Sequence, residues 1–251
     1  LDASIAQSDS YSYGFVAEGF ANDRPFLGNA LSYANNSMPS ASESTTRRVG
    51  LVGNVNYVYD NRYYADFSLR TDGSSQFGAN KRFGTFWSIG IGWNLHQENF
   101  LKNCELFNTL RLRLSYGETG SQKFSAYQAL PMFKYYDNDR YGYWGGAYLM
   151  GLGNEDLKWQ YTNTYNIGFE AMFWKGLLGV EFDMFYSLTK RKIEAQSGSY
   201  PPSLGGYYSS LVNSGEHENK GFELVLTHQN KIGEVDYSIK GNLSWARNKI
   251  L

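Results

Sequence analysis

The chain has 251 residues, a net charge of −1 and no cluster of basic residues, which argues against a nucleic-acid partner. Its only cysteine, Cys104, excludes an internal disulfide and gives no metal-site pattern. No apolar segment approaches the roughly 20 residues that a membrane helix needs. Aromatic residues make up 17% of the chain, more than a core usually requires, and such rings collect at membrane interfaces and in binding loops.

The first part of the chain carries the weakest signal. Residues 1–6 are predicted to be the end of a strand, and residues 21–46 are predicted to form an extracellular loop. The sequence begins at Leu1 rather than at methionine and shows no signal peptide. We therefore expect the N-terminus of the protein to be missing from this chain.

From residue 47 onward, eight segments alternate apolar and polar residues with a period of two. In the clearest one the odd positions carry Trp87, Ile89 and Ile91, while the even positions carry Ser88 and Gly90. This period indicates β-strands whose two faces meet different surroundings. The predicted strands are 49–59, 63–71, 85–95, 110–116, 159–173, 178–188, 222–228 and 235–245.

The apolar faces of these segments contain no charged residue. An Arg or Lys facing lipid at the bilayer midplane costs about 2–4 kcal/mol, so a lipid-facing surface must exclude it. The sequence therefore predicts an all-β fold, an antiparallel transmembrane β-barrel. The opposite faces hold eleven charges, namely Arg48, Asp66, Arg70, Arg111, Arg113, Glu170, Glu181, Asp183, Glu223, Asp236 and Lys240.

Short and long connections broadly alternate, as in barrels with tight periplasmic turns and long extracellular loops. Asp60-Asn61 and Lys175-Gly176 suit tight turns, and residues 96–109 suit a short helical cap. The two long connections, 117–158 and 189–221, are predicted to be functional loops.

These loops hold the candidate substrate or lid contacts. Aromatic rings stack on sugar faces or peptide side chains, and they also pack within a loop or against a partner. An Asp-Asn-Asp run suggests a Ca²⁺ or sugar-hydroxyl contact, but it supplies too few of the 6–8 oxygens of a calcium site, so a solvated turn is the simpler interpretation. The candidates are Asp137, Asp139, Tyr141, Tyr143, Trp144, Tyr207 and Tyr208.

The remaining residues give no enzyme signature, since the three histidines are scattered and have no plausible nucleophile nearby. The tryptophans of the apolar phase are predicted to contact the bilayer or its interface, namely Trp87, Trp93, Trp159 and Trp245.

Several motifs follow one another at strand and loop edges: Asp72-Gly73-Ser74-Ser75-Gln76-Phe77-Gly78, Phe83-Gly84-Thr85-Phe86-Trp87-Ser88, Leu110–Gly120, Asn154-Glu155-Asp156-Leu157-Lys158-Trp159 and Asn219-Lys220-Gly221-Phe222-Glu223. In this order they resemble the SusC/RagA family of TonB-dependent outer-membrane transporters over about residues 47–251. Trp87, where the family often has proline, and Arg111, where lysine is usual, depart from the pattern.

The resemblance implies a 22-stranded barrel around a plugged lumen, of which residues 1–251 are the C-terminal part without the plug. It further implies active import of a large nutrient, an oligosaccharide or oligopeptide, across a Gram-negative outer membrane. The implied partners are a SusD-like surface lipoprotein as a lid, TonB as the energy source and outer-membrane lipid, and no cofactor is implied. The inward-facing Arg111 and Arg113 suggest an anion channel, but, paired with lumen carboxylates such as Glu170 and Asp183, they are expected to be structural salt-bridge partners to the plug.

Two alternatives share parts of this pattern. A passive porin or an adhesin-type barrel would show the same strands. A soluble β-rich binding module would need a second sheet to bury the apolar faces.

Overall fold

The computed structural model describes residues 1–20, 30–34, 39–102, 104–199, 201 and 207–251, and it describes their side chains except those of 136–141, 197, 199, 207 and 208. Strands and two short 3-10 helices make up its elements: β1 (Asp2–Gly14), β2 (Ala17–Glu18), β3 (Ser32–Tyr33), β4 (Ser40–Tyr59), β5 (Tyr63–Ser74), β6 (Phe83–Asn94), η3 (Leu95–Gln97), β7 (Phe107–Ser121), β8 (Met132–Tyr141), β9 (Trp144–Gly151), β10 (Gln160–Phe173), η4 (Trp174–Gly176), β11 (Leu178–Ser199), β12 (Tyr207–Ile232) and β13 (Val235–Ile250). No described helix is long and apolar enough to span a bilayer.

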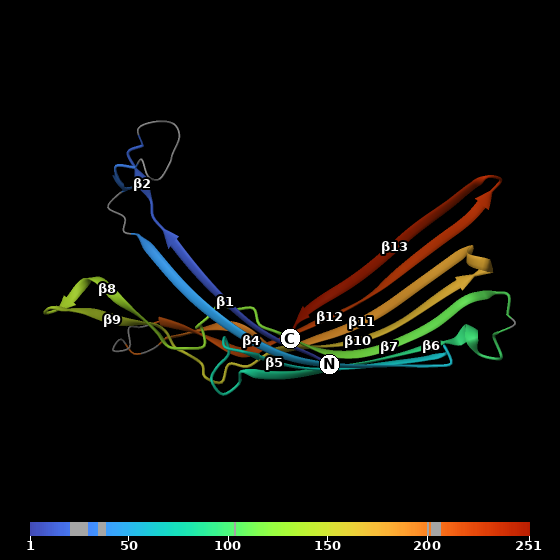
Figure 1. Ribbon diagram of the computed structural model, residues 1–251, viewed down its shortest axis with the longest axis horizontal. Coiled ribbons are helices and arrows are strands. Elements are labelled where there is room, and N and C mark those ends of the chain that lie inside the picture. Colours follow the sequence, from blue (N-terminus) through green and yellow to red (C-terminus); the bar gives the residue numbers. More distant parts are fainter. Residues whose placement is uncertain (21–29, 35–38, 103, 200, 202–206) are drawn as a thin grey trace.

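Nine strands form one curved antiparallel sheet in the order β1-β4-β5-β6-β7-β10-β11-β12-β13, and this confirms the predicted fold class. Neighbours in the sheet follow one another along the chain, apart from the small β2–β3 and β8–β9 hairpins. The sheet does not close, because β1 and β13 are its two edges. Figure 1 shows short turns at one end of the sheet, the short-turn end, and β8 and β9 extending from the other, the long-loop end.

The strand register confirms the assignment of the two faces. Register partners lie side by side on the same face, so the pairing tests the assignment independently of the sequence pattern. One unbroken row of partners crosses eight strands, from β4 to β13, without a charged residue: Tyr57, Ala65, Ile91, Leu114, Ile167, Met184, Phe222 and Trp245.

This apolar face has no protein layer over it. Ile91, Ile167 and Met184 are 50%, 52% and 49% exposed in the middle of their strands. The accessible surface of the chain is 18081 Å², whereas a compact soluble protein of 28.5 kDa exposes about 11,000 Å². The soluble-module alternative, which needs a second sheet on this face, therefore finds no support in the described residues.

The tight connections agree with the expected turn chemistry. Asp60 and Asn61 have positive φ angles of 49° and 52° in the three-residue turn 60–62 between the paired Tyr59 and Tyr63, and Lys175 and Gly176 also have positive φ. The predicted helical cap is the 3-10 helix η3, which begins at Leu95.

The strands are longer than the sequence pattern indicates. The expected loop 189–221 is mostly strand, because β11 continues to Ser199 and β12 begins at Tyr207. Within 117–158, β7 continues to Ser121 and the β8–β9 hairpin follows. At the start of the chain, β1 runs to Gly14 and β4 begins at Ser40 inside the expected 21–46 loop. These extensions project beyond the apolar band, where both faces are polar and the period-two signal disappears.

Candidate functional site

The candidate residues of the longest connection lie on the β8–β9 hairpin, which extends from the long-loop end of the sheet (Figure 1). Its turn contains Gly142, with a φ of +62°, and Tyr143, which is 101% exposed, and it is followed by Trp144, which is 80% exposed. Asp137, Asp139 and Tyr141 belong to β8, but their side chains lie outside the described residues.

The second group of candidates, Tyr207 and Tyr208, opens β12, and their side chains also lie outside the described residues. The backbone brings the two groups to the same end of the sheet. At the base of the hairpin, a Cβ added to Gly151 would stand 3.4 Å from the carbonyl oxygen of Ser209. The loop candidates therefore share one region of the molecule, although they are more than 60 residues apart in the sequence.

The two ends of the β8–β9 hairpin pack against a small hydrophobic core, to which three loops contribute residues. Phe77, Ala129 and Leu157 are at most 2% exposed and form its centre. The ring centroid of Phe77 lies 5.1 Å from that of Phe124 and 4.4 Å from that of Trp159. Because Ala129 and Leu157 bracket the hairpin in the chain, this core, the loop core, holds both of its ends.

Two of the sequence motifs, 72–78 and 154–159, contact each other at the loop core. The Gly78 N–H donates to the carbonyl oxygen of Leu157 (3.2 Å), and the Asn80 N–H donates to that of Glu155 (3.4 Å). A Cβ on Gly78 would stand 2.0 Å from the Glu155 carbonyl oxygen, so only glycine allows this approach. The Asn154 amide then donates to the Leu211 carbonyl oxygen of β12 (2.8 Å), which ties the motifs to the sheet.

Trp159 corrects one prediction. Instead of facing lipid, its ring packs between Phe77 and Phe86, and its Nε1 donates to the Arg82 carbonyl oxygen (3.1 Å). Trp159 precedes the first residue of β10, so the alternation of that strand does not govern its direction. Trp87, Trp93 and Trp245 lie within strands, on the apolar face as predicted.

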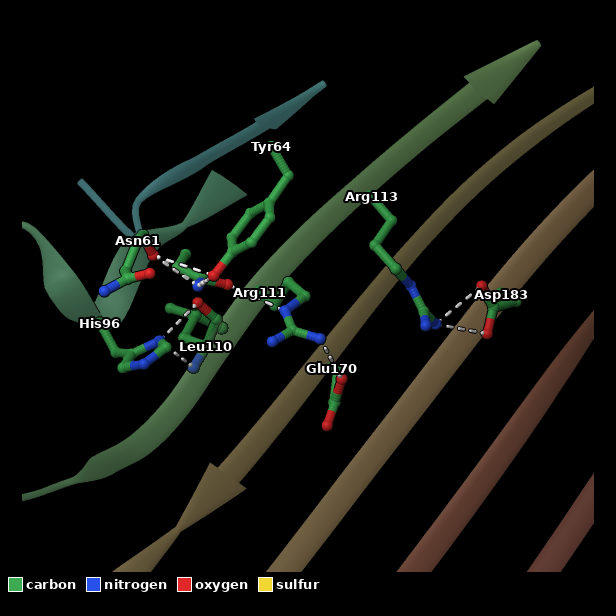
Figure 2. Close-up of polar contacts among 9 residues, drawn as sticks. Asn61, Tyr64, His96, Leu110, Arg111, Arg113, Glu170 and Asp183 are labelled. Carbon is green, nitrogen blue, oxygen red and sulfur yellow. Dashed lines mark hydrogen bonds and ion pairs between the residues drawn. The ribbon is translucent and has the colours of Figure 1, made fainter. Parts of the chain in front are cut away.

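The polar face carries ion pairs that cross strands, as Figure 2 shows. Arg113 donates to both carboxylate oxygens of Asp183, at 3.1 and 3.0 Å. The residue between them in the sheet register is Gly168, and a Cβ there would come within 2.1 Å of Asp183 Oδ1. Glycine at this position therefore lets a side chain of β7 reach β11 across β10.

A second polar group closes the short-turn end of the same face. Arg111 lies 3.7 Å from Glu170 and donates through Nε to the Asn94 side-chain oxygen (2.8 Å). Asn94 is 4% exposed, and its amide donates to the Asn61 carbonyl oxygen (2.7 Å) and the Tyr64 hydroxyl (2.9 Å). These pairs confirm the expected pairing of the two arginines with lumen carboxylates. The role of Asn94 was not predictable from the sequence, because an asparagine at a strand end is common.

The histidine and acidic side chains that the structure describes do not assemble into a metal-binding cluster. His96 Nδ1 accepts the backbone N–H of Leu110 (3.3 Å), and no group of three or more His, Cys, Asp or Glu that could hold a metal ion occurs among them. What the structure offers is a two-faced wall, with an apolar face towards one environment and an ion-paired polar face towards another.

A family model described as "TonB dependent receptor-like, beta-barrel" matches residues 2–250. The chain belongs to this TonB-dependent receptor family. Its place is therefore the outer membrane of a Gram-negative bacterium, with the apolar face, now the outer face, towards lipid and the polar face towards the barrel lumen. The short-turn end is accordingly periplasmic, and the long-loop end is extracellular.

Curated relatives and solved structures agree with this assignment. The chain is 33% identical, over 95% of its length, to "TonB-dependent receptor P3" of Formosa agariphila, and 32% identical, over 80%, to "TonB-dependent receptor SusC" of Bacteroides thetaiotaomicron. It covers 24% and 20% of these relatives, so it spans about a quarter of their length or less. A RagAB peptide transporter structure matches 99% of this chain and 27% of its own, with a TM-score of 0.83 and 24% identity, a likeness of fold.

Proposed function

We propose that this chain is part of a transporter that imports a large nutrient, an oligosaccharide or oligopeptide, across the outer membrane. TonB supplies the energy, and a SusD-like surface lipoprotein closes the extracellular mouth. The observation that carries this proposal is the two-faced wall, which ends in an aromatic hairpin at its extracellular end. A wet lumen face suits a hydrophilic cargo, and exposed rings suit the faces of sugars or peptide side chains.

The named relatives support the class of cargo. One carries the name SusC, and the matched RagAB structures are described as a peptide transporter and importer. The candidates for contact with cargo or lid are the described side chains of Tyr143 and Trp144, together with Asp137, Asp139, Tyr141, Tyr207 and Tyr208. The loop core supports this role because it keeps the hairpin in a fixed position relative to the mouth.

The test uses the full-length receptor in its native outer membrane and follows uptake of labelled oligosaccharides and oligopeptides. Replacing Tyr143 and Trp144 together by alanine should reduce uptake about tenfold, in proportion to the loss of two stacking rings. The matched control is Phe100→Ala, another exposed ring (70%) at the periplasmic end, which should leave uptake unchanged. Uptake that persists in cells without TonB would instead identify a passive porin.

A further inference from the structure

The outer face carries a basic hollow at its extracellular end, just above the aromatic rows. It measures about 500 Å³, and the residues around it include Lys81, Lys158, Arg191, Tyr161 and Asn163. Tyr161 and Asn163 belong to the outer phase of β10, two and four residues beyond Tyr165. Phe83 and Thr85 of β6 line the hollow from the same outer phase, whereas Gly84 and Phe86 line it from the polar phase, so the hollow opens mainly towards the membrane.

Its height on the barrel corresponds to lipid headgroups. Phe107 and Tyr116 of β7 pair with Phe173 and Tyr165 on the outer face of β10, and a register shift at Met172/Phe173 leaves eight regular steps between them. Eight residues span roughly 27 Å along the strand and about 21 Å along the membrane normal at a tilt of 40°. This agrees with the roughly 25 Å apolar band of such barrels. Trp87, Tyr116 and Tyr165 form the upper girdle, with ring centroids 4.9 and 4.8 Å apart, and the hollow begins above it.

The cations around the hollow lack counter-ions. Lys81, Lys158 and Arg191 form no ion pair with any residue that the structure describes. The carboxylate on its lining is Glu118, which accepts a hydrogen bond from the Tyr116 hydroxyl (3.0 Å). Three cations and one carboxylate leave a positive surplus that suits an anion.

The backbone directs one of these cations towards the hollow at the expense of local strain. The register of β11 against β12 slips between Thr189 and Lys192, and Arg191 within this bulge has a φ of +54°. A bulge turns a side chain out of its regular direction. Here the Arg191 guanidinium lies over the ring of Tyr161, 5.1 Å from its centroid. Strain of this kind concentrates where a binding group must be held in place.

A buried hydrogen-bond acceptor beside these cations indicates that the ligand also carries a hydrogen-bond donor. The side-chain oxygen of Asn163, another lining residue, is buried and has no hydrogen-bond partner among the described residues. A carbonyl oxygen needs a donor, and a sugar hydroxyl supplies one next to an anionic group. Tyr161 provides a flat ring beside both.

We infer that this hollow binds the phosphorylated sugar headgroup of an outer-leaflet glycolipid. Lys81, Lys158 and Arg191 receive the phosphate, and Asn163 receives a sugar hydroxyl. The inference concerns the lipid around the receptor and is independent of the transported cargo.

The experiment measures how much phosphorylated glycolipid stays bound to the full-length receptor, by native mass spectrometry after mild detergent extraction. Lys158→Gln with Arg191→Gln should lower the bound fraction at least about tenfold. The control Lys102→Gln with Lys175→Gln removes the same charge at the periplasmic end and should leave the bound fraction unchanged. A wild-type level in the first variant would overturn the inference.

Two further arms separate the alternatives. Glu118→Gln removes the carboxylate beside the cations, so it should raise glycolipid retention, a gain that a folding defect does not produce. Receptor stripped of lipid is then offered vesicles with phosphorylated or dephosphorylated glycolipid, or inorganic phosphate. Preference for the phosphorylated glycolipid supports the inference, whereas equal binding of both glycolipids, or saturation by inorganic phosphate alone, would overturn it.

Discussion

At the scale of single residues, Glu98 orders the connection between β6 and β7 at the periplasmic rim. Its carboxylate accepts hydrogen bonds from the Tyr63 hydroxyl (2.6 Å), the Trp93 indole N–H (3.0 Å) and Arg62 (3.3 Å). These groups, the Tyr63 hydroxyl foremost, hold the pKa of the Glu98 carboxyl below its ordinary value of 4.5. Tyr59, Tyr63 and Trp93 stack at this site, so Glu98 also fastens the periplasmic aromatic girdle.

This arrangement predicts a loss of stability in acid. A carboxyl whose pKa is lower in the folded state contributes its full stability above the unfolded pKa and loses it as the pH falls through the folded pKa. Between about pH 5 and pH 3, the temperature of heat-induced barrel unfolding should therefore fall more steeply for the wild type than for Glu98→Gln. Glu105→Gln, an exposed carboxyl in the same connection, should retain the wild-type slope. Equal slopes for wild type and Glu98→Gln would contradict the assignment.

At the scale of elements, the loop core predicts a matched pair of glycine variants. Gly78→Ala places a methyl group against the Glu155 backbone, whereas a Cβ at Gly145 meets no atom within 4 Å. Overpacking costs about 1–3 kcal/mol, enough to undock the 75–82 and 152–158 loops. When trypsin is added to intact cells, it should then cleave the Gly78→Ala receptor after Lys123 or Lys158 roughly tenfold faster than the wild type. The Gly145→Ala receptor should be cleaved at the wild-type rate. Unchanged cleavage in Gly78→Ala would show that the motifs do not support each other.

The same elements explain what the sequence predicts well. Strand faces within the membrane were predictable, because lipid forbids charge on alternate residues and the register of β4 to β13 keeps those residues in one row. The length of the strands was not predictable from the sequence, because both faces of β11 beyond Leu188 are polar and the alternation ends there. The contact between Phe77 and Leu157 joins residues 80 positions apart, and periodicity carries no information about such a contact. For that reason the motifs were visible in the sequence while their interlocking, and the direction of Trp159, were not.

At the scale of the whole molecule, stability depends on two surroundings, lipid on the outer face and water on the lumen face. Few large side chains are buried within the sheet, and the exposed outer face replaces the core of a soluble protein. Burial of that face in lipid, at about 25 cal/mol per Å² of apolar area, supplies the stability that internal packing supplies elsewhere. A charge should therefore be tolerated or rejected according to its face and not according to its strand.

Neighbouring residues of β6 test this directly. Ile91 is 50% exposed in the middle of the outer row, and Gly92 faces the lumen with no atom closer than 3.6 Å to an added Cβ. In the full-length receptor, Ile91→Lys should cost about 2–4 kcal/mol and remove most of the heat-modifiable barrel from the outer membrane. Gly92→Lys adds the same charge one residue away but extends it into the wet lumen, so its barrel should assemble at a level close to the wild type. If both variants assembled equally well, neither face of β6 would lie in lipid at this level. Assembly of Ile91→Lys together with failure of Gly92→Lys would instead reverse the orientation of the sheet.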